Sequence, residues 1–159
     1  MTPRREPAPA WTGAARAALV LSMLAVGLSG YLTVTHYTDP AALACPDRGL
    51  INCTLVTTSS WSAIAGVPVA LIGLIWALAM AALSLPWAWH ADSEWPGRAR
   101  LAGATAGALM VLYLVYVELF RVDAICLWCS AVHLTALCLF GVVLWSRPVA
   151  TRPVRAVPR

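Results

Sequence analysis

Residues 101–145 read LAGATAGALMVLYLVYVELF, then RVDAI, then CLWCSAVHLTALCLFGVVLW. Each of the two apolar runs has about 20 residues, which as a helix would extend roughly 30 Å and match the hydrocarbon core of a membrane. Glu118 is the one acidic residue inside these runs, and it lies near an end, where we expect interfacial water to reach it. The stretch therefore predicts two membrane-spanning helices joined by a short polar loop.

Two further apolar runs, residues 14–37 and 66–89, have similar lengths. The chain is 60% hydrophobic and 11% charged, whereas charged residues make up about 25% of a typical soluble domain. We therefore predict an all-α membrane protein, a bundle of four transmembrane helices capped by an outer loop with a short half-helix. The expected organisation is a cytoplasmic segment at 1–13, a transmembrane domain at 14–146 with its outer loop at 38–65, and a cytoplasmic tail at 147–159.

The arginines predict the orientation of this bundle, because the chain contains no lysine. Of the 11 arginines, all but Arg48 and Arg121 lie before or at the start of the first run, between the second and third, or after the fourth. This bias places both termini in the cytoplasm and the remaining two loops on the outer side of the cell membrane. The net charge of +4 then reflects topology and indicates no nucleic-acid partner. The alternative is that the first run is a cleaved signal peptide.

Cys126 and Cys129 open the fourth apolar run as a C-x-x-C motif. On a helix, residues at this spacing are close enough to form a disulfide. Backbone amides at the helix N-terminus favour a thiolate, most of all at the first cysteine. At about 100° per residue, His133 falls on the face of the two cysteines, whereas Cys138 does not and is expected to be a packing residue. Trp128 points to the opposite side and is expected to face lipid.

A second cysteine pair, Cys45 and Cys53, lies in the outer loop. Pro46 and Gly49 favour a turn between the two cysteines, so that a disulfide can close. The hydroxyl residues at 57–60 are expected to cap a short helix at 59–65, with Trp61 at the membrane interface.

Two cysteine pairs on the oxidising side of a membrane suggest electron transfer between soluble thiols and a molecule dissolved in the lipid. Two simpler interpretations remain open. The loop disulfide can be a structural staple, and four cysteines can in principle bind zinc. The oxidising compartment favours disulfides, so we expect no metal. Haem attachment requires a histidine directly after the second cysteine, where this chain has Ser130.

The chain resembles the vitamin K epoxide reductase family in the order of its motifs, over residues 31–137. These motifs are Cys45 and Cys53 in the outer loop, Ser59 with Trp61 close behind, GVPVALIG at 66–73, and Cys126 and Cys129 opening the fourth run. The resemblance implies a four-helix bundle around a quinone, which could be menaquinone, ubiquinone or phylloquinone.

The resemblance also implies a role for each cysteine. Cys45 matches the cysteine that exchanges with a thioredoxin-fold partner, and Cys53 matches the shuttle cysteine that attacks Cys126. Cys129 matches the cysteine that faces the quinone ring, and Ser59 the hydroxyl close to the quinone head group. The expected function is oxidation of a separate, extracytoplasmic DsbA-like or thioredoxin-like protein, with the electrons passed to the quinone to support disulfide-bond formation.

The chain departs from the animal members of the family at two places. They carry an asparagine beside the quinone on the second helix, and a tyrosine at the position where this chain has His133. His133 is accordingly a candidate quinone contact, and these departures favour the bacterial type over vitamin K quinone or epoxide reduction. A DsbB-type enzyme would carry its two cysteine pairs in the opposite order. A tetraspan protein with two non-catalytic disulfides is the remaining alternative.

Overall fold

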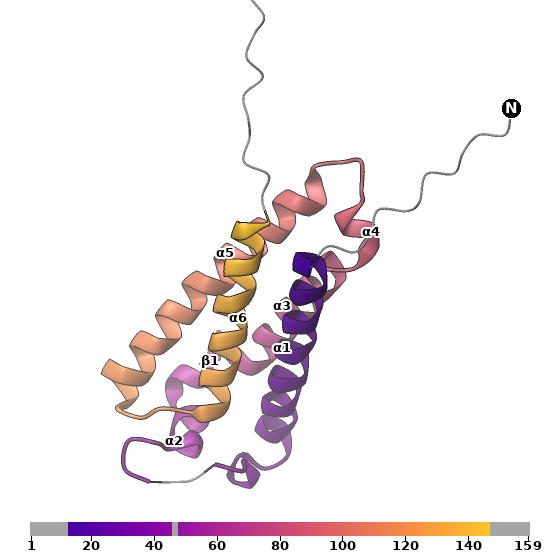
Figure 1. Cartoon of the computed structure of the whole chain (residues 1–159). Helices are drawn as coiled ribbons and strands as arrows, with labels where there is room; N and C mark the ends of the chain where they lie inside the picture. The colour runs from indigo at the N-terminus through magenta and orange to yellow at the C-terminus, as the bar shows by residue number, and fades with distance from the viewer. Residues whose placement is uncertain (1–12, 46–47, 147–159) are drawn as a thin grey trace, which may run out of the picture.

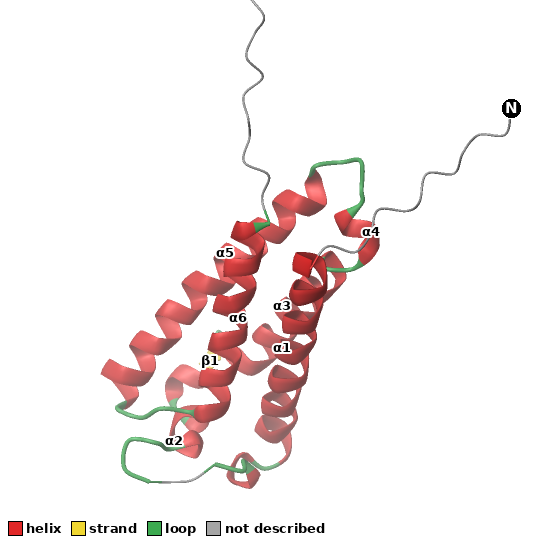
Figure 2. Cartoon of the chain, viewed as in Figure 1, coloured by secondary structure: helices red, strands yellow, loops and turns green. Residues whose placement is uncertain are grey.

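The computed structural model describes residues 13–45 and 48–146; the predicted terminal segments (apart from Gly13) and Pro46 lie outside them. Four helices run alongside one another, namely α1 (Gly13–Thr38), α3 (Val69–Leu83), α5 (Trp95–Val117) and α6 (Leu127–Trp145) (Figure 1). Helices dominate the fold, as Figure 2 shows. Shorter elements lie at the two ends of the bundle: η1 (Pro40–Ala42), α2 (Cys53–Thr58), η2 (Ser60–Ser62), β1 (Ala63–Ile64), β2 (Val67–Pro68), α4 (Pro86–Trp89) and the π-helical turn η3 (Glu118–Val122).

Three helices in the described residues are long and apolar enough to cross a membrane, namely Gly13–Thr38, Trp95–Val122 and Leu127–Trp145. The first and the last agree with the predicted runs to within a residue at each end. The middle one begins six residues before the predicted residue 101, because Pro96 in its first turn supports helix initiation. These spans make the chain a membrane protein with a helical bundle.

The second predicted span, residues 66–89, is wrong in its bounds. The helix there is α3, with 15 residues, so it rises only about 22 Å. It ends because Leu85, which precedes Pro86, is extended (ψ 158°), as a residue before proline usually is. The count of four membrane spans therefore stays a prediction.

The predicted half-helix at 59–65 is wrong in its extent, because only the 3-10 turn η2 (Ser60–Ser62) lies there. The helix of the outer loop is α2, and its N-cap is Asn52, whose side chain accepts a hydrogen bond from the Leu55 backbone N–H at 2.7 Å. Residues 63–68 form a two-stranded hairpin instead. Its two turn residues, Ala65 and Gly66, both have positive φ (51° and 82°), which is the backbone that a tight hairpin requires.

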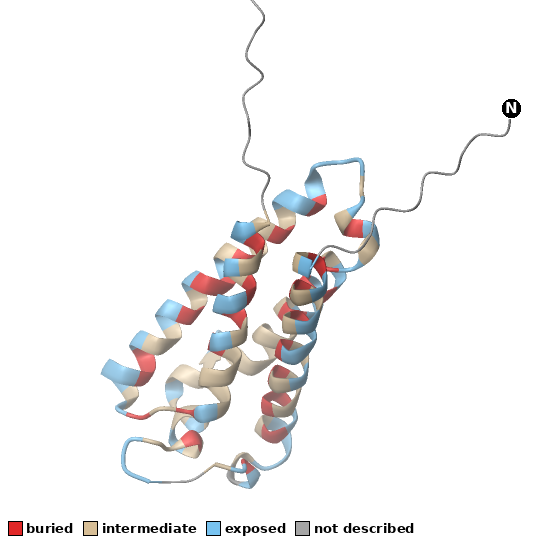
Figure 3. Ribbon diagram, viewed as in Figure 1, coloured by how far each residue is buried: buried red, intermediate tan, exposed pale blue. Residues whose placement is uncertain are grey.

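The centre of the bundle is filled by small and aliphatic side chains from all four long helices: Ala18, Met80, Ala104, Leu139 and Val143. Large apolar side chains also cover the outer surface, where Leu109, Leu112 and Leu134 are more than 60% exposed. Figure 3 shows exposed residues along the outside of α1, α5 and α6. An exposed apolar surface of this extent fits contact with lipid. Cys138 lies on it and is exposed, so the prediction that it is a packing residue is wrong.

Helices α3 and α5 approach closely where Trp76 crosses two glycines. The Trp76 indole N–H donates to the Gly103 carbonyl at 2.8 Å. A Cβ added at Gly107 would come within 2.8 Å of the indole Cε2 atom, closer than real contacts allow. The absence of a side chain at Gly107 is therefore what lets the indole lie against α5.

Gly107→Ala is expected to destabilise the bundle by about 1–3 kcal/mol, the usual effect of overpacking. The measurement is the midpoint of thermal unfolding in detergent micelles. Gly141→Ala is the matched control, because a Cβ there meets nothing within 4 Å, and alanine gains about 1 kcal/mol over glycine in helix propensity. Equal destabilisation by both substitutions would contradict the role given to the Trp76 contact.

Candidate functional site

Both cysteine pairs lie at the same end of the bundle, near α2 and opposite to α4 (Figure 1). Cys45 and Cys53 form a disulfide with a Cα–Cα distance of 6.1 Å. The expected turn between them is present, since Gly49 has φ 59° and Arg48 pairs with Ile51 through two backbone hydrogen bonds of 3.0 and 3.1 Å. The two sulfurs differ in access: Cys45 is half-buried, whereas Cys53 is fully buried.

A short backbone pairing joins the outer loop to the segment that precedes α6. The Ile125 N–H donates to the Leu50 carbonyl at 2.8 Å, and the Asn52 N–H donates to the Ile125 carbonyl at 3.1 Å. Cys53 and Cys126 directly follow these paired residues.

Cys53 and Cys126 consequently belong to one buried cluster with Leu32 and Leu43, and both cysteines are 0% exposed. One sulfur of the loop disulfide is thus packed in the same apolar space as one thiol of the C-x-x-C motif. This placement suits direct sulfur-to-sulfur exchange without water.

Cys126 is the N-cap of α6, and its sulfur accepts a hydrogen bond from the Cys129 backbone N–H at 3.3 Å. A hydrogen bond from the Cys129 side chain lowers the pKa of Cys126, and the backbone N–H groups of Cys129 and Trp128 act in the same direction against the opposing effect of burial. The helix N-terminus thus favours a thiolate at the first cysteine, as its position in the sequence predicts.

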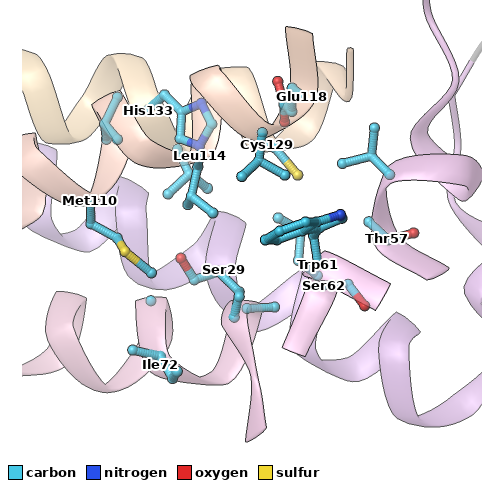
Figure 4. Close-up of a pocket in the computed structure, with 18 of the residues that line it drawn as sticks. Ser29, Thr57, Trp61, Ser62, Ile72, Met110, Leu114, Glu118, Cys129 and His133 are labelled. Atoms are coloured by element: carbon cyan, nitrogen blue, oxygen red, sulfur yellow. The ribbon is translucent and has the colours of Figure 1, made fainter. Parts of the chain in front are cut away.

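An apolar cavity of about 320 Å³ lies between the helices below the outer loop. Three of the predicted site residues, Ser59, Cys129 and His133, line it, whereas Cys126 is buried behind them. Figure 4 shows Cys129 and His133 from α6 lying across the cavity from Ser29, with the Trp61 ring beside them. Cys129 is therefore the cysteine of the motif that a molecule in the cavity would meet.

Two other residues of the cavity were not predicted. Glu118 was expected near interfacial water, but it is only 6% exposed and lines the cavity. Trp61 was expected at the membrane interface, but its ring also lines the cavity, and the Arg121 guanidinium carbon lies 4.9 Å from the ring centroid. The sequence did contain a signal for Glu118. It is the one acidic residue inside an apolar run, and an ionisable residue inside a membrane span usually has a function.

Trp128 does not face lipid as expected. Its indole N–H donates to the Ala44 carbonyl at 3.0 Å, and its ring lies 4.7 Å from the ring of Tyr31. The Tyr31 hydroxyl in turn accepts a hydrogen bond from the Ala44 backbone N–H at 3.2 Å. Trp128 therefore anchors the start of the outer loop, next to Cys45, on α1 and α6.

The cavity has the size and lining of a small-molecule site. Small-molecule sites are mostly apolar, with a few polar groups that fix orientation, and they start at about 300 Å³. This cavity has that size and an apolar lining from α1, α3 and α5, with the polar groups of Ser59, Glu118 and His133 among them. A thiol, Cys129, completes the lining.

The model of the vitamin K epoxide reductase family matches residues 16–144, which is most of the chain. No curated protein sequence matches the chain.

Proposed function

Because the chain belongs to the vitamin K epoxide reductase family, whose members are quinone-linked membrane oxidoreductases, we propose that it is a quinone-dependent thiol oxidoreductase. It reoxidises a separate extracytoplasmic protein of the DsbA or thioredoxin type and so supports disulfide-bond formation. The electrons pass from the Cys45–Cys53 pair to the Cys126–Cys129 pair and then to the quinone.

The observation that carries this proposal is the burial of Cys53 and Cys126 in one cluster, with Cys129 one helical turn further on in the wall of the cavity. The half-buried Cys45 leaves one sulfur of the loop disulfide open to a protein partner. The proposed path thus runs from a half-buried sulfur that a partner can reach, through two fully buried sulfurs, to the half-buried Cys129 in the cavity wall. A purely structural disulfide would not need this arrangement.

The exchange proceeds by thiolate attack at each step. A partner thiolate attacks Cys45 and releases Cys53, which attacks Cys126 of the oxidised motif and releases Cys129. The second thiol of the partner then displaces Cys45, and the partner leaves oxidised. Cys45 attacks Cys53, which restores the loop disulfide and leaves Cys126 and Cys129 reduced, the state that the described structure contains.

A bound quinone supplies an acceptor for two electrons and two protons. Ser59, Cys129 and His133 would hold it, together with the apolar wall of the cavity. Cys129 donates the electrons, and the Cys126–Cys129 disulfide re-forms. Assays with different quinone substrates decide which of the three quinone types the cavity binds.

The proposed topology places the cysteine end outside the cytoplasm and both termini inside. The described arginines support this topology. Arg16, Arg98 and Arg100 belong to the end of the bundle opposite to the cysteines, whereas only Arg48 and Arg121 of the described arginines lie at the cysteine end. In this arrangement α3, extended by the hairpin and by α4, makes the fourth crossing of the membrane.

The test of the function uses the full-length protein, purified in detergent. Dithiothreitol serves as electron donor, and short-chain analogues of ubiquinone and menaquinone serve as acceptors in parallel assays. We expect quinone to be reduced with a stoichiometry of one quinone per disulfide formed. If neither analogue is consumed faster than in the absence of protein, the chain is not a quinone-dependent oxidase.

Ser59→Ala is expected to reduce the rate of quinone reduction about fivefold, which corresponds to one hydrogen bond of about 1 kcal/mol. The Ser59 hydroxyl now donates to the Val56 carbonyl at 2.8 Å, so it has to turn toward the cavity to stabilise a reduced quinone oxygen. Thiol exchange between the two cysteine pairs should stay intact, as measured by alkylation with a mass tag. Ser60→Ala is the matched control, because Ser60 is exposed; equal rates in the two variants would remove Ser59 from the site.

A further inference from the structure

Glu118 is a buried carboxyl group that the exchange reactions do not use. Its side chain is 6% exposed, and the one ion pair among residues 13–45 and 48–146 joins Arg98 and Glu94 on the surface. The nearest cation of its own turn, Arg121, lies over the Trp61 ring. Burial of a carboxyl group without a cation costs free energy, so its retention calls for another reason.

The surroundings of Glu118 point to that reason. It lines the cavity with Cys129, and its carboxyl group interacts electrostatically with both cysteines of the motif and with the Cys126 backbone N–H. Figure 4 shows Glu118 next to Cys129 at the same side of the cavity.

The backbone also departs from regular helix at this residue. Glu118 begins the π-helical turn η3, and its carbonyl accepts the Asp123 and Ala124 N–H groups, the latter at 3.1 Å. Short π-helical turns in α-helices frequently occur at functional sites. This one ends the span of α5 at the level of the motif.

We propose that Glu118 is a catalytic proton carrier between the reduced Cys126–Cys129 pair and a quinone in the cavity. The inference rests on the proposed function and adds to it the path of the protons. The carboxylate accepts the proton of the Cys129 thiol and, as the acid, donates it to a quinone oxygen. Cys126 is displaced as a thiolate and carries no proton, so the second proton comes from water and reaches the quinone by the same carboxylate.

The reaction balances in electrons and protons. The Cys126 thiolate and the Cys129 thiol lose two electrons and one proton and form one S–S bond, while the quinone gains these two electrons, this proton and one proton from water and becomes the quinol. Glu118 begins and ends as the carboxylate. No further oxidant or reductant is required, because the partner protein supplies the next pair of electrons through Cys45 and Cys53.

The test compares Glu118→Gln with the wild-type protein in the assay with dithiothreitol and the short-chain quinones. Glutamine keeps the shape of the side chain but carries no transferable proton, and general acid–base catalysis typically contributes about 10²–10⁴-fold. We expect quinone reduction to fall by about 10²-fold with cysteine exchange intact, and Glu118→Asp to restore part of the rate with a shifted pH profile. Glu94→Gln, on the exposed start of α5, is the matched control and should leave the rate unchanged.

The pH profile has to be read against the other titratable and charged groups around the cavity, which are His36 of α1, Arg121 and Asp123 of the same turn, and Cys126, Cys129 and His133 of α6. An infrared difference spectrum of quinone-free protein gives a second readout. Reduction of the cysteine pair should change a carboxyl band in the wild-type protein, and Glu118→Gln should abolish that change.

The outcomes separate the two proposals. A wild-type protein that reduces no quinone contradicts the proposed function itself. If the wild type is active but Glu118→Gln keeps its rate and pH profile, or the infrared change persists in that variant, Glu118 carries no proton. If Glu118→Gln fails to fold, the pH profile of Glu118→Asp decides, because a purely structural carboxyl would leave that profile unchanged.

Discussion

Cys129→Ala is expected to lower quinone reduction by at least about a thousandfold, because loss of a reacting nucleophile from a catalytic unit has effects of that size or larger. Cys126→Ala should be equally inactive for a different reason. Cys129 is the thiol in the cavity wall, whereas Cys126 is buried with Cys53 and receives the electrons from it. The measurement is the rate of quinone consumption with dithiothreitol as donor.

The two variants should differ in the mixed disulfides that they can still form. Cys129→Ala retains Cys126 next to Cys53, and the Cys126 thiolate keeps the support of the helix N-terminus that lowers its pKa. It should therefore accumulate mixed disulfides, whereas Cys126→Ala should not. Cys138→Ala is the control, since Cys138 lies on the outer face of α6. Equal activity in all three variants would contradict the cysteine roles.

The long helices were predictable from the sequence because burial in lipid needs only an uninterrupted apolar run. Their ends were less predictable. The run at 66–89 is apolar throughout, but the positive φ of Gly66 and the extended Leu85 before Pro86 confine the helix to Val69–Leu83. Backbone geometry overrides composition at both ends.

The helix of the outer loop was mispredicted because the threonine hydroxyl groups donate hydrogen bonds to backbone carbonyls instead of accepting them from backbone N–H groups. Thr57 donates to the Cys53 carbonyl at 2.9 Å and Thr58 to the Thr54 carbonyl at 2.7 Å. They therefore bond within α2 and do not cap a following α-helix; the short turn η2 and the hairpin follow instead. The residue that does cap α2, Asn52, precedes the hydroxyl cluster.

The members of the site were partly predictable. The spacing of Cys129 and His133 placed both on one face of α6, and both line the cavity. Glu118 could not be placed, because its position depends on how η3 turns against the start of α6. The approach of Cys53 to Cys126 depends on the pairing of residues 50–52 with Ile125, which joins segments more than 70 residues apart.

The backbone pairing of residues 50–52 with Ile125 leads to the second prediction with a large effect, a cross-link between Cys53 and Cys126. Cys45 and Cys129 are the two thiols that could break a disulfide between Cys53 and Cys126. The double variant Cys45→Ala/Cys129→Ala lacks both of them. Cys53 and Cys126 are both fully buried in one cluster. We expect them to form an intrachain disulfide in most of the protein, detected as a cross-linked peptide by mass spectrometry after digestion without reductant.

The matched control is Cys45→Ala/Cys126→Ala, which leaves Cys53 with Cys129. Cys129 is only partly buried and packs against the cluster of Cys53 and Cys126 from the cavity side, so this variant should form less of the cross-link. Cys138 cannot substitute in either variant, because it lies 12 residues beyond Cys126, about 18 Å along α6. Equal cross-linking of Cys53 to Cys126 and to Cys129 would mean that the outer loop moves freely over the motif. The backbone pairing of Ile125 would then not set the direction of electron transfer.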